Sequence, residues 1–151
     1  AAKTIEPSKD YVIPFGKGRI ALESNNDNNT TICIITYGMG VYWANNAAHA
    51  HKGKVTILDL RTLAPIDTQA VFDAVRKHNK CLVLTEEPKG FGFAQALAGE
   101  IQQECFEYLD APVRVLGAEN MPAIPLNSTL EQTMIPNAAK VEKVLTEILA
   151  Y

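Results

Sequence analysis

The apolar residues of this chain fall into short continuous runs, and segments with helical spacing separate these runs. Four of the runs are rich in β-branched and aliphatic residues, as expected for strands that are buried on both faces. A fifth strand is expected at residues 19–23, and the polar turn Ser24–Asn29 predicts that it forms an antiparallel hairpin with the next strand. The four buried strands are expected at residues 31–36, 55–60, 81–85 and 113–116.

Helices are expected between the strands. Residues 93–106 carry apolar side chains at the i, i+3, i+4, i+7 spacing of an amphipathic helix, and residues 41–49 are expected to form a shorter one. Small polar residues mark the start of three more helices, because their side chains accept hydrogen bonds from free backbone N–H groups. The predicted N-caps are Asp67, for a helix to about Lys77, Ser128 in a capping box with Glu131, and Asn137 for the last helix.

Alternating strands and helices predict the α/β class. The expected architecture has three layers, α/β/α, around a five-stranded, mostly parallel sheet with one antiparallel edge strand. The length of 151 residues suits a single domain. Residues 1–18 contain prolines and glycines and are predicted to form a linker, so the domain itself is expected at residues 19–151.

Charge and cysteine content exclude several classes of protein. The net charge is −3 and the 14 basic residues are scattered, which argues against a nucleic-acid partner and against a basic membrane-binding surface. No apolar stretch approaches the length of a membrane span. Cys33, Cys81 and Cys105 lack CxxC spacing and are predicted to be buried, reduced thiols in a reducing compartment.

Ligands of open parallel sheets bind at the carboxyl ends of the strands, and the segment Glu86–Gly92 is the most suggestive candidate there. A glycine loop between a strand and a helix can present N–H groups to an anion. This loop lacks the third glycine of the dinucleotide motif and no GK[ST] follows, so a tight turn is favoured over an anion site.

Charged residues at the same strand ends are interpreted as candidate domain-interface residues. Glu86 and Glu87 are adjacent and should point to opposite faces, which places them poorly for shared acid–base chemistry. Asp59 and Arg61 are expected to pair through one face of a strand end. His49 and His51 are two positions apart on a predicted helix and do not form a metal pair. We assign no catalytic, cofactor-binding or metal-binding residue.

The order of several segments resembles one family. The segments are DYVIPFGKGRI, TYGMGVYWANNAA, VTILDLRTLAPIDTQAVFDAV, EEPKGFGFAQALAGEIQQECFEYLDAPVRVLGAENMPAIP and MIPNAAKVEKVLTEIL. Together they resemble the C-terminal, transketolase-like domain in the β subunit of thiamine-diphosphate-dependent 2-oxo acid dehydrogenases of the pyruvate or 2-oxoisovalerate type. The resemblance extends from about Asp10 to Tyr151.

The resemblance implies a role in assembly. Enzymes of this family decarboxylate a 2-oxo acid oxidatively and pass the acyl group to a lipoyl arm, using thiamine diphosphate and magnesium. The GDG…N diphosphate motif and the activating glutamate of the family have no counterpart here. The chain is therefore expected to follow a pyrimidine-binding domain in a larger protein, and to be inactive when isolated.

The same resemblance implies partners and docking residues. The expected partners are an α subunit or a fused α half, a second β C-terminal domain, and the lipoyl acyltransferase core. The implied contacts with the acyltransferase are Asp110 and the terminal carboxylate of Tyr151. The expected location is the bacterial cytoplasm or, alternatively, the mitochondrial matrix.

Two alternatives stay open at this point. The chain could be the C-terminal domain of another transketolase-like enzyme, such as transketolase, deoxyxylulose phosphate synthase or a ferredoxin oxidoreductase. It could also be a free-standing α/β protein that binds an anion or nucleotide at the Glu86–Gly92 loop.

Overall fold

The computed structural model describes residues 7–25 and 30–151. Its centre is a five-stranded sheet, which confirms the predicted strand number and the α/β class. The strands are β1 (Arg19–Leu22), β2 (Ile32–Thr36), β3 (Val55–Asp59), β4 (Cys81–Pro88) and β5 (Arg114–Ala118). They lie in the order β1-β3-β2-β4-β5, and every neighbouring pair except β1 with β3 is parallel.

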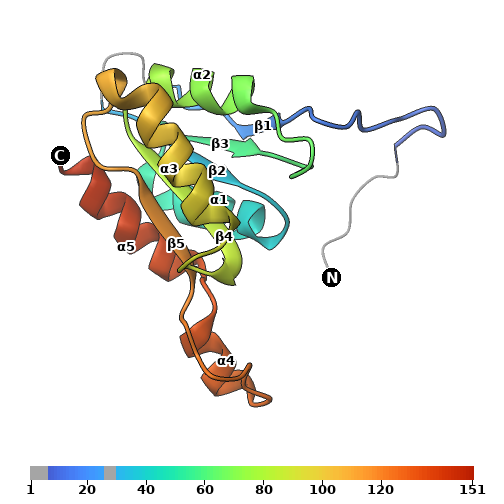
Figure 1. Ribbon diagram of the computed structural model, residues 1–151, viewed down its shortest axis with the longest axis vertical. Coiled ribbons are helices and arrows are strands. Elements are labelled where there is room, and N and C mark those ends of the chain that lie inside the picture. Colours follow the sequence, from blue (N-terminus) through green and yellow to red (C-terminus); the bar gives the residue numbers. More distant parts are fainter. Residues whose placement is uncertain (1–6, 26–29) are drawn as a thin grey trace.

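Helices cover both faces of the sheet, as the alternating pattern predicted (Figure 1). The helices are α1 (Met39–Ala48), η1 (His49–His51), α2 (Thr68–His78), α3 (Phe93–Cys105), η2 (Phe106–Tyr108), α4 (Ser128–Met134) and α5 (Ala138–Leu149). One buried core joins the sheet to α2 and α3, and a second joins it to α1 and α5. The short helix α4 lies outside this sandwich, in a lobe that projects beyond the end of β5 (Figure 1).

The antiparallel edge strand is confirmed, but its predicted partner is wrong. β1 pairs with β3, with Arg19 opposite Asp59 and Ile20 opposite Leu58, and it does not form a hairpin with β2. Both edges of β2 are already bonded to β3 and β4, so β1 is left with the outer edge of β3. Much of the predicted turn Ser24–Asn29 lies outside the described residues.

Two of the three predicted helix caps are confirmed. The Asp67 carboxylate accepts a hydrogen bond from the Ala70 N–H at 3.3 Å, and Asn137 caps α5 in the same way. The capping box at Ser128 is wrong by one residue. Asn127 is the N-cap of α4 and accepts from the Thr129 N–H at 2.9 Å, because its backbone is extended while Ser128 already belongs to the helix.

The three cysteines are buried and free, as predicted. Cys33 and Cys81 are register partners on β2 and β4. A hydrogen bond with Cys33, together with burial, raises the pKa of Cys81 well above its usual value. Burial also raises the pKa of Cys105. Thiolate is the reactive form of cysteine, so Cys81 and Cys105 serve as apolar packing groups.

Residues 7–18 form an irregular arm that leaves the body of the domain (Figure 1). The end of the arm nearest β1 is anchored by two hydrogen bonds. The Gly16 N–H donates to Thr62 Oγ1 at 2.9 Å, and the Gly18 N–H donates to Asp67 Oδ2 at 3.0 Å. In the described part of the chain, no helix has both the length and the apolar character needed to cross a bilayer.

Candidate functional site: the two edges of the sheet

At the carboxyl edge of the sheet, the glycine loop that joins β4 to α3 surrounds a carboxylate of this same chain, that of Glu87. Glu87 Oε1 accepts a hydrogen bond from the Ala94 N–H, in the first turn of α3, at 2.7 Å. A Cβ atom on Gly92 would lie 2.7 Å from Glu87 Cδ, so the glycine makes room for the carboxylate. The free N–H groups at the N-terminus of a helix attract negative charge, and here the Glu87 carboxylate occupies that position. The loop is therefore closed to an external phosphate in this conformation.

Two contacts made by Lys89 stabilise the rest of this loop. The Lys89 N–H donates to the Ala118 carbonyl at 2.9 Å, and the Lys89 ammonium pairs with Glu119 at 2.6 Å. Glu86 is exposed, whereas Glu87 folds back onto α3. The two carboxylates therefore have separate surroundings and form no acid–base pair.

Asp59 and Arg61 lie close together but do not make the predicted side-chain ion pair. Asp59 pairs with Arg19 at 3.6 Å, and its Oδ1 accepts from the backbone N–H of Arg61 at 3.1 Å. Arg61 has a left-handed backbone with φ of 59°. Its guanidinium donates to the hydroxyl of Tyr11, in the N-terminal arm, at 3.2 Å. The pairing prediction is wrong because the left-handed turn presents the backbone of Arg61 to Asp59.

No described residue is assigned to thiamine diphosphate or its magnesium ion. Within residues 7–25 and 30–151, no group of three or more His, Cys, Asp or Glu side chains could hold a metal ion by itself. The Glu86–Gly92 loop, which the sequence offered as an anion site, is filled by Glu87. No chemical step of the cofactor is therefore assigned to these residues.

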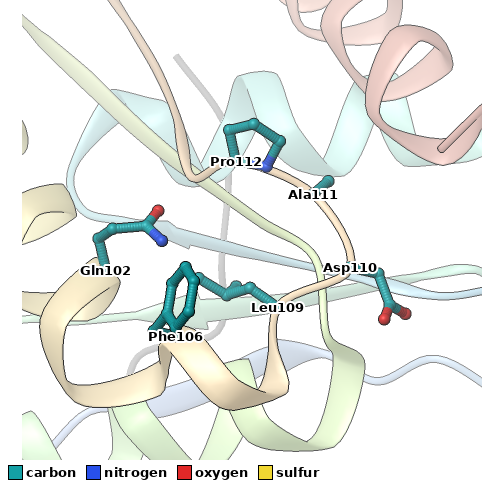
Figure 2. A pocket seen from close by; sticks show the side chains of 6 residues that line it. All are labelled: Gln102, Phe106, Leu109, Asp110, Ala111 and Pro112. Atoms are coloured by element: carbon teal, nitrogen blue, oxygen red, sulfur yellow. The ribbon is translucent and has the colours of Figure 1, made fainter.

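At the amino edge of the sheet, Asp110 lies in the loop between η2 and β5, where the sequence predicted it. Its N–H donates to the Asn79 carbonyl at 2.8 Å, and the residue is exposed. Its carboxylate points away from an adjacent hollow of about 440 Å³ (Figure 2). Phe106, one wall of this hollow, is 69% exposed. The hollow is lined by Gln102, Phe106, Leu109, Asp110, Ala111 and Pro112.

A stripe of acidic side chains leads to Asp110. Glu100 and Glu104 are exposed and lie four positions apart on α3, a spacing that places them on one face, and the exposed residue Glu107 follows in η2. Within the part of the chain that the structure describes, none of these residues or Asp110 forms an ion pair. We call these four residues the acidic stripe. It presents exposed carboxylates beside the hollow that Phe106, Leu109 and Pro112 help to line.

Tyr151 lies at the same end of the domain as Asp110. An ion pair of 3.4 Å between Arg114 and Glu147 joins the start of β5 to the last turn of α5. Figure 1 shows the C-terminus at this end, beside the segment that leads into β5. The Tyr151 side chain is exposed. The structure thus brings both predicted docking residues to one edge, while their role in docking stays a prediction.

Sequence reasoning missed two features of these edges. It did not predict that Glu87 caps α3, because this contact spans seven residues across a glycine turn. The absence of Ser, Thr, Asp or Asn at the start of α3 was the available signal. It also missed the acidic stripe, although Glu100 and Glu104 on the polar face of the predicted helix at residues 93–106, with Glu107 just after it, could have indicated it.

Fold and edges together define a three-layer α/β/α domain in which Glu87 fills the glycine loop at the carboxyl edge and acidic side chains lie at the amino edge. The family described as "Transketolase, C-terminal domain" matches residues 22–141, and the chain belongs to this family. A solved split-gene transketolase, described as an inactive β4 tetramer, has the same fold with a TM-score of 0.71 and 18% identity, over 95% of this chain and 45% of that one.

Curated relatives point to a narrower group. The chain is 34% identical over 148 residues to the 2-oxoisovalerate dehydrogenase subunit beta of Bacillus subtilis, covering 96% of this chain and 44% of the relative. It is 30% identical over 152 residues to the pyruvate dehydrogenase E1 component subunit beta of Rickettsia conorii, covering 99% and 43%. The chain thus spans less than half the length of these relatives.

Proposed function

We propose that this chain is the C-terminal assembly and docking domain of the decarboxylating component of a 2-oxo acid dehydrogenase complex. The observation that carries the proposal is the 34% identity to a 2-oxoisovalerate dehydrogenase β subunit over 96% of the chain. The full enzyme would decarboxylate a 2-oxo acid and transfer the acyl group to a lipoyl group. Thiamine diphosphate and magnesium would bind in other domains of that enzyme.

In this proposal the two edges of the sheet have different partners. Residues 1–18 connect a pyrimidine-binding domain to the body at residues 19–151. The proposed partners are an α subunit or a fused α half, a second copy of this domain, and the lipoyl acyltransferase. Asp59, Arg61, Glu86 and Glu87 lie at or just beyond the carboxyl ends of β3 and β4. In the proposal, these four residues face the preceding domain. The proposed location is the bacterial cytoplasm or the mitochondrial matrix.

The acyltransferase would dock at the amino edge. The acidic stripe and the hollow beside Phe106 suit a small basic partner that also buries an apolar side chain. Opposite charges across an interface steer association and fix the orientation of the partner. Asp110 and the terminal carboxylate of Tyr151 are the proposed contacts, and the Arg114–Glu147 pair holds their two segments together.

Decarboxylation by the full-length gene product tests this proposal. The protein, with any α partner encoded beside it, would be assayed with pyruvate, branched-chain 2-oxo acids and 2-oxoglutarate, using an artificial electron acceptor. Activity with one of these acids that depends on thiamine diphosphate supports the proposal. Ketol transfer between sugar phosphates without oxidative decarboxylation would instead identify a transketolase-type enzyme and contradict it.

A further inference from the structure

The segment between β5 and α5 has little core of its own. We call residues 120–135 the α4 lobe, and it projects beyond the end of β5 (Figure 1). Its residues 120–133 are all exposed apart from Pro125, which is half-buried. Segments with few buried apolar contacts open locally at a lower free energy than the whole domain. The groups that attach the α4 lobe to the body therefore decide whether it stays in place.

Two contacts close the base of the α4 lobe. The Glu119 N–H donates a hydrogen bond to the Met134 carbonyl at 3.0 Å, which joins the start of the lobe to its end. The Met134 side chain is 8% exposed and is the one buried side chain of the lobe. These contacts hold the base of the lobe, but they leave other carbonyl groups at the end of α4 without a partner.

A single ammonium group supplies those partners. Lys140 Nζ donates to the carbonyl oxygens of Ile135 at 2.7 Å, Thr133 at 2.8 Å and Gln132 at 3.2 Å. We call these three oxygens the carbonyl cup. The last carbonyls of a helix have no partner within the helix, and an ammonium group offers three N–H donors. The three donors of Lys140 thus match the three acceptors of the carbonyl cup.

Lys140 belongs to the body of the domain, whereas its acceptors belong to the lobe. Its backbone N–H donates to Asn137 Oδ1 at 3.0 Å, at the cap of α5. The next residue, Val141, is fully buried in the core that joins α5 to the sheet. Within residues 7–25 and 30–151, Lys140 forms no ion pair with a carboxylate. The ammonium group is therefore fixed by a packed helix and is directed to the carbonyl cup.

We propose that Lys140 is a latch, which holds the α4 lobe closed against the body through the charge of its ammonium group. Hydrogen bonds from a charged donor are stronger than those between neutral groups, so one side chain can hold the whole segment. Removing the charge should release the lobe as a unit and leave the sheet intact. Backbone carbonyls also bind monovalent cations, so a cup emptied by a shortened side chain should accept a small ammonium ion.

Limited proteolysis of the 151-residue chain with chymotrypsin measures this release. Leu126 and Leu130 are exposed cleavage sites within the α4 lobe, and the exposed residue Phe106 in η2 is the internal reference. Lys140→Met keeps the aliphatic stem without the charge and should accelerate cleavage at the two leucines at least tenfold relative to cleavage at Phe106. The matched control is Lys143→Met, which removes an exposed ammonium group from the same helix and should leave this ratio unchanged.

Chemical rescue tests whether the charged donor itself holds the lobe. Lys140→Ala should be cleaved in the lobe as fast as Lys140→Met, because both lack the ammonium group. Methylammonium chloride should slow this cleavage in Lys140→Ala by filling the carbonyl cup. Tetramethylammonium chloride at the same concentration should not, since it carries the charge but has no N–H donor.

Three results would overturn the inference. One is a ratio of lobe cleavage to Phe106 cleavage that Lys140→Met leaves unchanged. Another is equal acceleration at the leucines and at Phe106, which would show that the substitution weakens the whole domain and that Lys140 is no local latch. The third is lobe cleavage of Lys140→Ala that proceeds equally fast in methylammonium and in tetramethylammonium.

Discussion

Glu87 Oε1 lies 2.7 Å from the Ala94 nitrogen, and this hydrogen bond fills the glycine loop at the carboxyl edge with an internal carboxylate. The carboxylate comes from the end of β4, passes over Gly92 and caps α3, which has no other side-chain cap. A position that serves phosphate ligands in other α/β proteins is used here to stabilise the fold.

Replacing Glu87 with alanine should destabilise the isolated chain. The substitution removes a helix cap and a favourable charge at the helix N-terminus, at a cost of about 1–2 kcal/mol in the free energy of unfolding. Gly92→Ala should act in the same direction, because its Cβ atom would displace the carboxylate. Urea denaturation monitored by circular dichroism measures both effects.

Glu86→Ala is the matched control for this series. Glu86 is the exposed neighbour, so its removal should change the free energy of unfolding by less than about 0.5 kcal/mol. Equal costs for the two alanine variants would show that the cap contributes nothing specific.

His78 should make stability fall in mild acid. The residue is 4% exposed, and its Nδ1 lies 2.8 Å from the hydroxyl of Thr31. Nε2 is buried and has no partner among the described residues. Burial, reinforced by the positive charge of Lys77 and opposed by Glu23, lowers the pKa of His78 from the ordinary value of 6.5.

The direction of the pH dependence follows from that shift. Below pH 6.5 the unfolded chain takes up a proton at this position, and the folded chain does not until the lower pKa is reached. The contribution of neutral His78 to the free energy of unfolding is therefore complete above pH 6.5 and is lost as the pH falls, with a slope of up to about 1.4 kcal/mol per pH unit.

Urea titrations from pH 8 to pH 5 should show this slope in the parent chain and a flatter one in His78→Gln. The exposed residue His49 provides the control, and a slope unchanged in His78→Gln but lost in His49→Gln would refute the assignment.

The isolated chain should bind thiamine diphosphate and magnesium only weakly. The described residues offer no magnesium cluster, and Glu87 fills the glycine loop. Titration calorimetry should therefore give a dissociation constant well above the micromolar range. Micromolar affinity corresponds to about −8 kcal/mol, and measuring it would place a cofactor site in this domain after all.

How far the sequence determined these results differs from element to element. The strand at Ile32–Thr36 was predicted because burial on both faces gives a continuous apolar run. Helix α3 was predicted because burial of one face gives apolar residues at helical spacing. The partner of β1 was not predictable from proximity along the chain, because β2 uses both of its edges for parallel partners. The Glu87 cap and the exposed ring of Phe91 depend on the path of one glycine loop, which no periodic pattern encodes.

The candidate docking site was predicted in position but not in extent. The sequence placed Asp110 in an exposed loop and Tyr151 at the end of the last helix, and the structure brings their segments together through Arg114 and Glu147. The hollow beside Phe106 arises where α3, η2 and the loop into β5 meet, so it exists only in the folded chain.

The assembly role is tested most directly by the affinity of the full-length enzyme for its acyltransferase as a function of salt. Close interfacial charge pairs contribute about 1.5 kcal/mol or more, so Asp110→Asn should weaken binding at least tenfold, with a larger effect at low ionic strength. Glu147→Gln is a useful comparison, because Glu147 is already paired with Arg114 and should matter less. Decarboxylation with an artificial electron acceptor should be unchanged in Asp110→Asn. Binding that is unaltered across ionic strength, or a parallel loss of decarboxylation, would contradict a docking role for the amino edge.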